Sequence, residues 1–107
     1  MTGRAETVKE VLVAARWILE NAGWCQNACA KRRDGFSVSA NSTEAVSFCA
    51  IGATYAVECD YSLAERARRR LLEQLPMNVC NVTVLNDQRG QTKEGILAFY
   101  DAAIAKL

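Results

Sequence analysis

The sequence contains no histidine, a single proline, and only 7% aromatic residues among its 107 positions. Without histidine the chain has no Ser-His-Asp or Cys-His catalytic pair and no histidine ligand for a metal ion. Its apolar runs are shorter than the roughly 18 residues of a membrane-spanning segment. The N-terminal residues also lack the apolar core of a secretory signal. We therefore expect a cytoplasmic protein with no membrane contact.

Charge and glycine motifs exclude further classes of protein. Thirteen basic and twelve acidic side chains give a formal net charge of +1. That is too little for a nucleic-acid binder that works through bulk charge, so such a role would need a local basic patch. No glycine-rich phosphate loop is present. We expect no catalytic residue and no cofactor, and the balance is against an enzyme.

Cysteine is the unusual component that is present. The five cysteines are Cys25, Cys29, Cys49, Cys59 and Cys80. A structural zinc site usually has two closely spaced cysteine pairs, whereas only Cys25 and Cys29 form one. The sequence predicts free thiols, as is usual in a reducing compartment, and no metal site. We expect Cys49 and Cys59 to be buried and inert.

Apolar spacing indicates four helices in one domain over residues 1–107. The predicted ranges are about 4–22, 43–58, 62–75 and 92–106. The second range is almost entirely apolar, so we predict that it is the buried central element. Cys49, Ala53 and Ala56 should lie in its interior. The expected fold class is therefore all-α, a compact four-helix domain.

Local signals mark some helix ends, and one segment stays ambiguous. Ser62 and Glu65 have the spacing of a capping box, and Thr92 is a predicted N-cap. Residues 77–85 fit a strand, but we favour a helix or irregular structure there. A short extended segment is expected near residues 36–40 or 79–84.

The third predicted helix has a basic face. Arg66, Arg69 and Arg70 share it through their three- and four-residue spacing, and the turn at 31–33 would add to it if it folds nearby. One interpretation is an anion or nucleic-acid contact. The other, which we favour, is a solvated helix face partly neutralised by neighbouring glutamates.

The first predicted helix has two large apolar residues on its polar side. Val13 and Trp17 lie four residues apart, opposite the predicted core face. Either the last helix of the chain covers them, or a partner does, and tryptophan is enriched at interface centres. We lean towards a partner surface, with self-association as one form of it.

Three segments resemble motifs of an uncharacterised family of small bacterial and phage proteins. The segments are Gly23-Trp24, Phe48-Cys49-Ala50-Ile51-Gly52-Ala53 and the stretch from Leu85 to Thr92. The family shows a Gly-Trp, a Cys-x-x-Gly-Ala box, and a Trp-Asn-Asp box with an Arg and a helix-opening Thr. Here Leu85 replaces the Trp, and Gly90 and Gln91 separate Arg89 from Thr92.

The resemblance implies an all-helical fold, a bacterial or phage cytosol, and a role for Asn86, Asp87 and Thr92. Asn86 and Asp87 suit a turn and Thr92 a helix cap, and we favour these structural roles over a ligand site. Trp24 and Arg89 are further binding candidates.

The leading functional hypothesis is a small interaction or regulatory protein that binds another protein, with homodimerisation among its forms. The alternatives are nucleic-acid or anion binding through the Arg66–Arg70 helix face, and a small-molecule or enzyme site near Asn86 and Asp87.

Overall fold

A computed structural model describes residues 4–107 of the chain. Over that range the helices are α1 (Val8–Asn21), α2 (Gly52–Ala56), α3 (Tyr61–Leu72), α4 (Val82–Asn86) and α5 (Lys93–Ala105). The strands are β1 (Ala30–Lys31), β2 (Ser37–Val38) and β3 (Ser47–Phe48). The prediction of an all-α, four-helix fold is therefore wrong, because the described chain combines five helices with a three-stranded antiparallel sheet.

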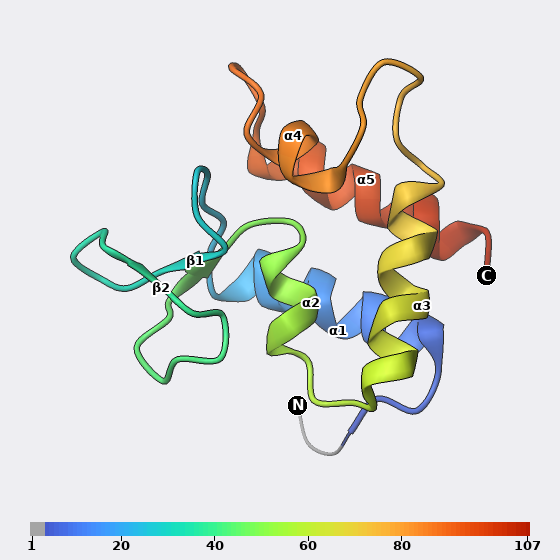
Figure 1. Ribbon diagram of the computed structural model, residues 1–107, viewed down its shortest axis with the longest axis horizontal. Coiled ribbons are helices and arrows are strands. Elements are labelled where there is room, and N and C mark those ends of the chain that lie inside the picture. Colours follow the sequence, from blue (N-terminus) through green and yellow to red (C-terminus); the bar gives the residue numbers. More distant parts are fainter. Residues whose placement is uncertain (1–3) are drawn as a thin grey trace.

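The sheet is small and has β1 at its centre, in the order β2-β1-β3. Ala30 of β1 lies opposite Val38 on one side and Phe48 on the other. The sheet and its loops, residues 30–48, form an arm that extends from one side of the helical body (Figure 1). β2 confirms the extended segment expected near 36–40.

The predicted helix at 43–58 fails because Phe48 has backbone partners on both sides. Besides pairing with β1, its N–H donates to the carbonyl of Gly23 and its carbonyl accepts from Cys25, each at 3.0 Å. A short apolar run fits a buried strand as well as a buried helix. Here long-range pairing keeps the chain extended, and α2 begins only at Gly52.

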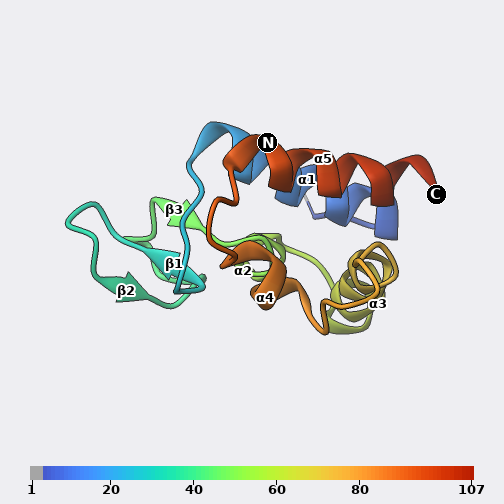
Figure 2. The same cartoon turned by 90° about the horizontal axis from the view of Figure 1, so that it is seen from above.

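The central element is α1, which packs against α2, α3 and α5. Figure 2 shows two layers, with α1 and α5 in one and α2, α3 and α4 in the other. The largest fully buried side chains come from both layers and include Leu12, Leu19, Leu71, Ile96 and Tyr100. Cys49 and Ala53 are buried as predicted, whereas Ala56 is only half-buried. None of the helices over residues 4–107 is long and apolar enough to cross a membrane.

The helix caps follow the sequence signals only in part. Thr92 caps α5 as predicted, since its hydroxyl accepts from the N–H of Gly95 at 3.0 Å. The capping box at α3 is wrong. The Ser62 side chain makes no cap, and Glu65 instead accepts from the hydroxyl of Tyr61 at 2.7 Å.

The ambiguous segment 77–85 ends in a helix. α4 begins after Asn81, whose side chain accepts from the N–H of Val84 at 2.8 Å. This short-range cap favours the helix, and the described chain has no strand at 79–84.

Candidate functional site

The three motif segments meet at the side chain of Asn86. Its Oδ1 accepts from the indole Nε1 of Trp24 at 2.6 Å and from the backbone N–H of Ala50 at 2.8 Å. Its Nδ2 donates to the carbonyl of Cys25 at 3.0 Å and to the carboxylate of Asp87 at 2.9 Å. Two acceptor and two donor positions are all that an amide side chain offers. Asn86 is fully buried and has no capacity left for a ligand.

Neighbouring polar groups add further hydrogen bonds between the segment after α1 and the end of α4. Asp87 accepts from the backbone N–H of Asn27 at 2.9 Å. Gln26 donates to the backbone carbonyls of Asn86 and Gln88, at 2.9 and 3.0 Å. Asn27 has a φ of 68°, the left-handed conformation that asparagine tolerates better than most residues. The segment after α1 is therefore held to the end of α4 by side chains from both.

Tyr100 holds the second motif segment from the other side. Its hydroxyl donates to the carbonyl of Ala50 at 2.6 Å, and the side chain is fully buried in the core. Burial raises the pKa of this phenol far above its ordinary value. Ala50 thus has its N–H bound by Asn86 and its carbonyl bound by Tyr100.

The glycine of the Cys-x-x-Gly-Ala box has a separate role. A Cβ atom at Gly52 would collide with the backbone carbonyl of Cys29, whose carbon would lie only 2.9 Å away. That carbonyl also accepts from the N–H of Cys49 at 2.9 Å. Gly52 is therefore needed for the close approach of α2 to the chain that enters β1.

These contacts favour a structural role for Trp24, Asn86 and Asp87. Sequence reasoning missed Gln26, Asn27 and Tyr100, which are partners in the same cluster. Nothing in the local sequence marks them, because each partner is distant along the chain. Arg89, the remaining candidate of this box, lies exposed in the turn between α4 and α5.

The cysteines are all free thiols. Over residues 4–107, no group of three or more His, Cys, Asp or Glu residues is arranged to hold a metal ion. Cys25 and Cys49 are buried, whereas Cys29 and Cys80 are exposed. Burial raises the pKa of Cys25, and it raises the pKa of Cys49 to about 11. Cys59, expected to be buried, is half-buried.

This arrangement predicts unequal thiol alkylation. The thiolate is the reactive form, and at pH 8 a thiol with a pKa of about 11 is only ~0.1% ionised. We expect iodoacetamide to modify exposed Cys29 and Cys80 in the folded protein and to modify Cys25 and Cys49 only after denaturation. Peptide mass mapping over time measures the rates. Labelling of Cys49 as fast as Cys80 would contradict the burial.

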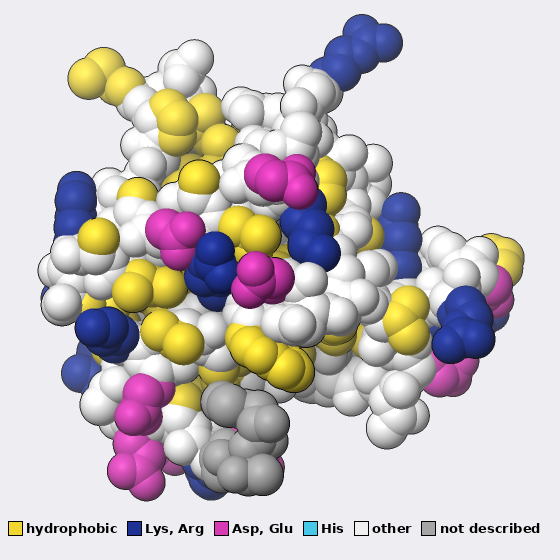
Figure 3. Space-filling model, turned by 180° about the vertical axis from the view of Figure 1, so that it is seen from behind, with side chains coloured by type: hydrophobic (Ala, Val, Ile, Leu, Met, Phe, Trp, Pro, Cys, Tyr) yellow, Lys and Arg dark blue, Asp and Glu magenta, His cyan; other side chains and the backbone are white. Residues whose placement is uncertain are grey.

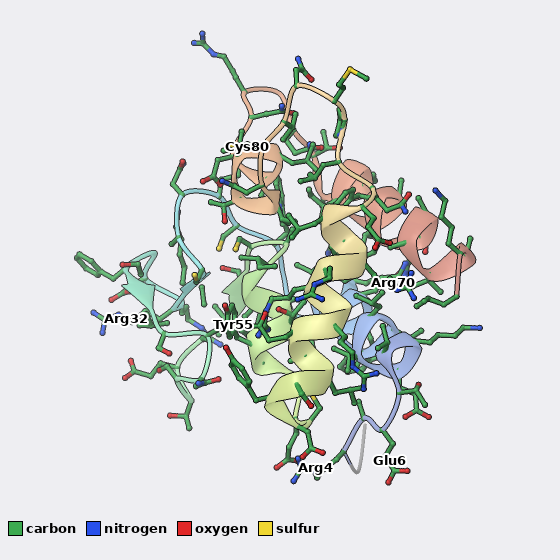
Figure 4. The ribbon with its side chains drawn as sticks, turned by 45° about the vertical axis from the view of Figure 1, so that its right-hand side comes forward. Arg4, Glu6, Arg32, Tyr55, Arg70 and Cys80 are labelled. Atoms are coloured by element: carbon green, nitrogen blue, oxygen red, sulfur yellow. The ribbon has the colours of Figure 1, made fainter. Side chains whose placement is uncertain are left out.

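The arginines of the basic face are on the surface of α3. Arg66, Arg69 and Arg70 are exposed, and together with Val8 and Glu73 they line a hollow of about 260 Å³. The turn at 31–33 does not join them. Arg32 lies on the arm and Arg70 on the other side of the molecule, as Figure 4 shows.

Arg68 differs from its neighbours because it is buried against α2. It donates to the hydroxyl of Thr54 at 3.1 Å, and its guanidinium lies 4.0 Å from the ring centroid of Tyr55. Tyr55 comes from α2 (Figure 4), so this contact joins α2 to α3. Helical spacing gave a sign of this, because Arg68 lies off the face of the other three arginines, four residues after Ala64 and three before Leu71, which are both buried.

Val13 and Trp17 are only about half covered by the chain itself. Their side chains are 47% and 51% exposed, although α5 packs against α1 nearby. Trp17 borders a hollow of about 250 Å³ lined mainly by small apolar residues. The lining consists of Ala5, Ala14, Trp17, Ile18, Ala56, Val57 and Glu58.

The fold and the cluster define a small α/β protein in which one buried asparagine ties three motif segments together. Residues 3–106 match the Family of unknown function (DUF6197), and the chain belongs to that family. No curated protein and no solved structure matches it. The all-helical fold that the resemblance implied is corrected by the sheet.

Proposed function

We propose that this chain is a small interaction protein and that the outer face of α1 is its binding surface, occupied by a second copy of the chain. The observation that carries the proposal is the half-exposed Trp17 beside a hollow on the same face, which is lined mainly by alanine and valine side chains and edged by Glu58. Tryptophan is among the residues most enriched at the energetic centres of interfaces.

A projecting ring next to a hollow suits a two-fold dimer. In such a dimer both copies use the same surface, so each Trp17 can enter the hollow of the other. The hollow of about 250 Å³ is larger than the roughly 150 Å³ apolar cavity that holds a benzene ring. Most of its lining side chains are alanine or valine, which let an aromatic ring approach closely.

The charges on α1 agree with an antiparallel pair of helices. Lys9 and Glu20 are exposed near opposite ends of α1, and their spacing places both on the face of Val13. Within the chain the Glu20 carboxylate also pairs with Arg16 at 3.1 Å. When two copies pair antiparallel around Val13 and Trp17, Lys9 of each faces Glu20 of the other. Figure 3, which views the α1 and α5 layer from outside, shows apolar surface with charged side chains of both signs around it.

The proposal predicts that Trp17→Asp dissociates a dimer without unfolding the protein. A carboxylate cannot fill the hollow as an indole does and would be repelled by Glu58 in its lining. We therefore expect the dissociation constant to rise at least about 30-fold, equivalent to ~2 kcal/mol. Light scattering after size exclusion, over a dilution series, measures the mass. Circular dichroism checks that the fold is retained, as expected for a half-exposed position.

Phe36→Asp is the matched control, because Phe36 is a 65% exposed aromatic residue on the arm. It should leave the dimer intact. The charge arrangement has its own test: Lys9→Glu should weaken the dimer, and adding Glu20→Lys should restore it. A wild type that is monomeric throughout the dilution series disproves the proposal, and a Phe36→Asp effect equal to that of Trp17→Asp disproves the assigned surface.

A further inference from the structure

The basic hollow on α3 carries a separate inference. It lies between the first turn of α1 and the outer side of α3, and its lining residues are Val8, Arg66, Arg69, Arg70 and Glu73. The surface of Val13 and Trp17 lies on a different side of α1, opposite the side that carries Val8. An occupant of this hollow would therefore not compete with the proposed dimer.

The positive charge of the hollow is only partly neutralised within the protein. On α3 the ion pairs are Glu65 with Arg68 at 3.9 Å and Glu73 with Arg70 at 3.4 Å. Over residues 4–107 no carboxylate lies within ion-pair distance of Arg66 or Arg69. Three guanidinium groups repel each other around one hollow, so an anion bound there would relieve the repulsion.

We propose that this hollow binds the phosphate group of a small phosphorylated ligand. A phosphate monoester has three free oxygens and about two negative charges at neutral pH. Three guanidinium groups line the hollow, and one of them, that of Arg70, also donates to Glu73 at 3.4 Å. A guanidinium fork matches phosphate oxygens in pairs. The three arginines and the single carboxylate of Glu73 leave two positive charges, which equals the charge of the phosphate. A carboxylate ligand, with two oxygens and one charge, would leave the third arginine without a partner.

The limited extent of the positive charge favours a small ligand over a nucleic acid. Nucleic-acid binders contact many phosphates in succession, and their affinity falls steeply with salt for that reason. Here the neighbouring hollow lined by Arg66 also contains Arg4, Glu6 and Asp60, and Arg4 is paired with Asp60 at 2.9 Å. Positive charge therefore does not continue along this surface beyond Arg66. In Figure 4, Arg4 and Glu6 lie below, away from Arg70 on α3.

Calorimetric titration of the full chain with pyrophosphate and with inorganic phosphate tests the proposal. We expect saturable binding of one ion per chain at constant ionic strength. Arg69→Ala should weaken it about tenfold, the usual effect of losing one charge-assisted hydrogen-bonded contact. Arg66→Ala should act similarly, and Arg69→Lys should lie between Arg69→Ala and the wild type because it keeps the charge but loses the fork. Both positions are exposed, so the melting temperature without ligand should not change in any of the three variants.

Arg33→Ala is the matched control, since Arg33 is an exposed arginine on the arm. This variant should bind phosphate as tightly as the wild type. Oligothymidine is titrated in parallel. Absence of saturable phosphate binding by the wild type disproves the site, and equal weakening by Arg33→Ala shows general charge attraction instead. Tight oligothymidine binding that depends steeply on salt and is lost in Arg69→Ala would overturn the proposal of a small ligand and indicate that the site binds nucleic acid.

Discussion

Asn86→Ala should lower the free energy of unfolding by about 3–5 kcal/mol, a large loss for a chain of this size. The substitution removes four side-chain hydrogen bonds at once. It leaves the N–H of Ala50 and the carbonyl of Cys25 without their partner in the interior. An unsatisfied buried polar group costs about 1–3 kcal/mol, so these two groups alone account for much of the effect. Urea denaturation followed by circular dichroism, at one fixed protein concentration, measures it.

Asn81→Ala is the matched comparison for that experiment. Asn81 is also an asparagine of the α4 region, but it is exposed and caps the helix through a single bond to the N–H of Val84. Loss of such a cap typically costs about 1 kcal/mol. If Asn86→Ala lowers the free energy of unfolding no more than Asn81→Ala does, the cluster does not hold the fold together, and a ligand role for Asn86 becomes the better explanation.

The sequence predicted the elements whose signals are local. α1 and α5 follow the apolar spacing, and α5 starts at the cap that Thr92 indicated. α1 begins at Val8 rather than at residue 4, after a cap by Thr7 that was not predicted. Helix α3 is also in place, although it ends at Leu72 rather than at residue 75. In these helices the apolar face and the packing agree, and in α5 the predicted cap agrees as well, so the local pattern is sufficient to place them.

The sheet could not be predicted in the same way. Each strand is only two residues long, which is too short for an alternating apolar pattern to appear. β3 exists because Phe48 pairs with β1 and with the segment at Gly23–Cys25. Those partners are 18 or more residues away along the chain, and a single sequence gives no record of such pairing.

The candidate residues show the same limit. Trp24, Asn86 and Asp87 were identified by resemblance, and the structure places them together. The sequence did not indicate that the backbone of Ala50 would bind both side chains, its N–H to Asn86 and its carbonyl to Tyr100. Helical spacing did place Val13 and Trp17 on the side of α1 opposite the core face. It left open whether the last helix covers them, and the structure shows that they are about half exposed.

Gly52→Ala is the second substitution with a large expected effect. In an ordinary helix, alanine is more favourable than glycine by about 1 kcal/mol. At this position we expect the opposite sign, with a loss of about 2–4 kcal/mol, because the new methyl group collides with the backbone of Cys29. That backbone cannot easily retreat, since the carbonyl of Cys29 accepts from Cys49 and the next residue, Ala30, is fully buried in β1.

Gly95→Ala supplies the comparison that separates close packing from helix propensity. Gly95 lies in the first turn of α5, and the nearest atom to an added Cβ is the side-chain oxygen of Gln91, the end of a flexible side chain. Moving that side chain breaks its hydrogen bonds with the carbonyl of Leu85 and the N–H of Thr92, but alanine gains about 1 kcal/mol of helix propensity in return. We therefore expect the stability of Gly95→Ala to stay within about 1 kcal/mol of wild type. Thermal and urea denaturation of the two variants side by side measures the difference. Equal stability of Gly52→Ala and Gly95→Ala would show that α2 can move away from Cys29, and the glycine of the Cys-x-x-Gly-Ala box would then need an explanation other than close approach.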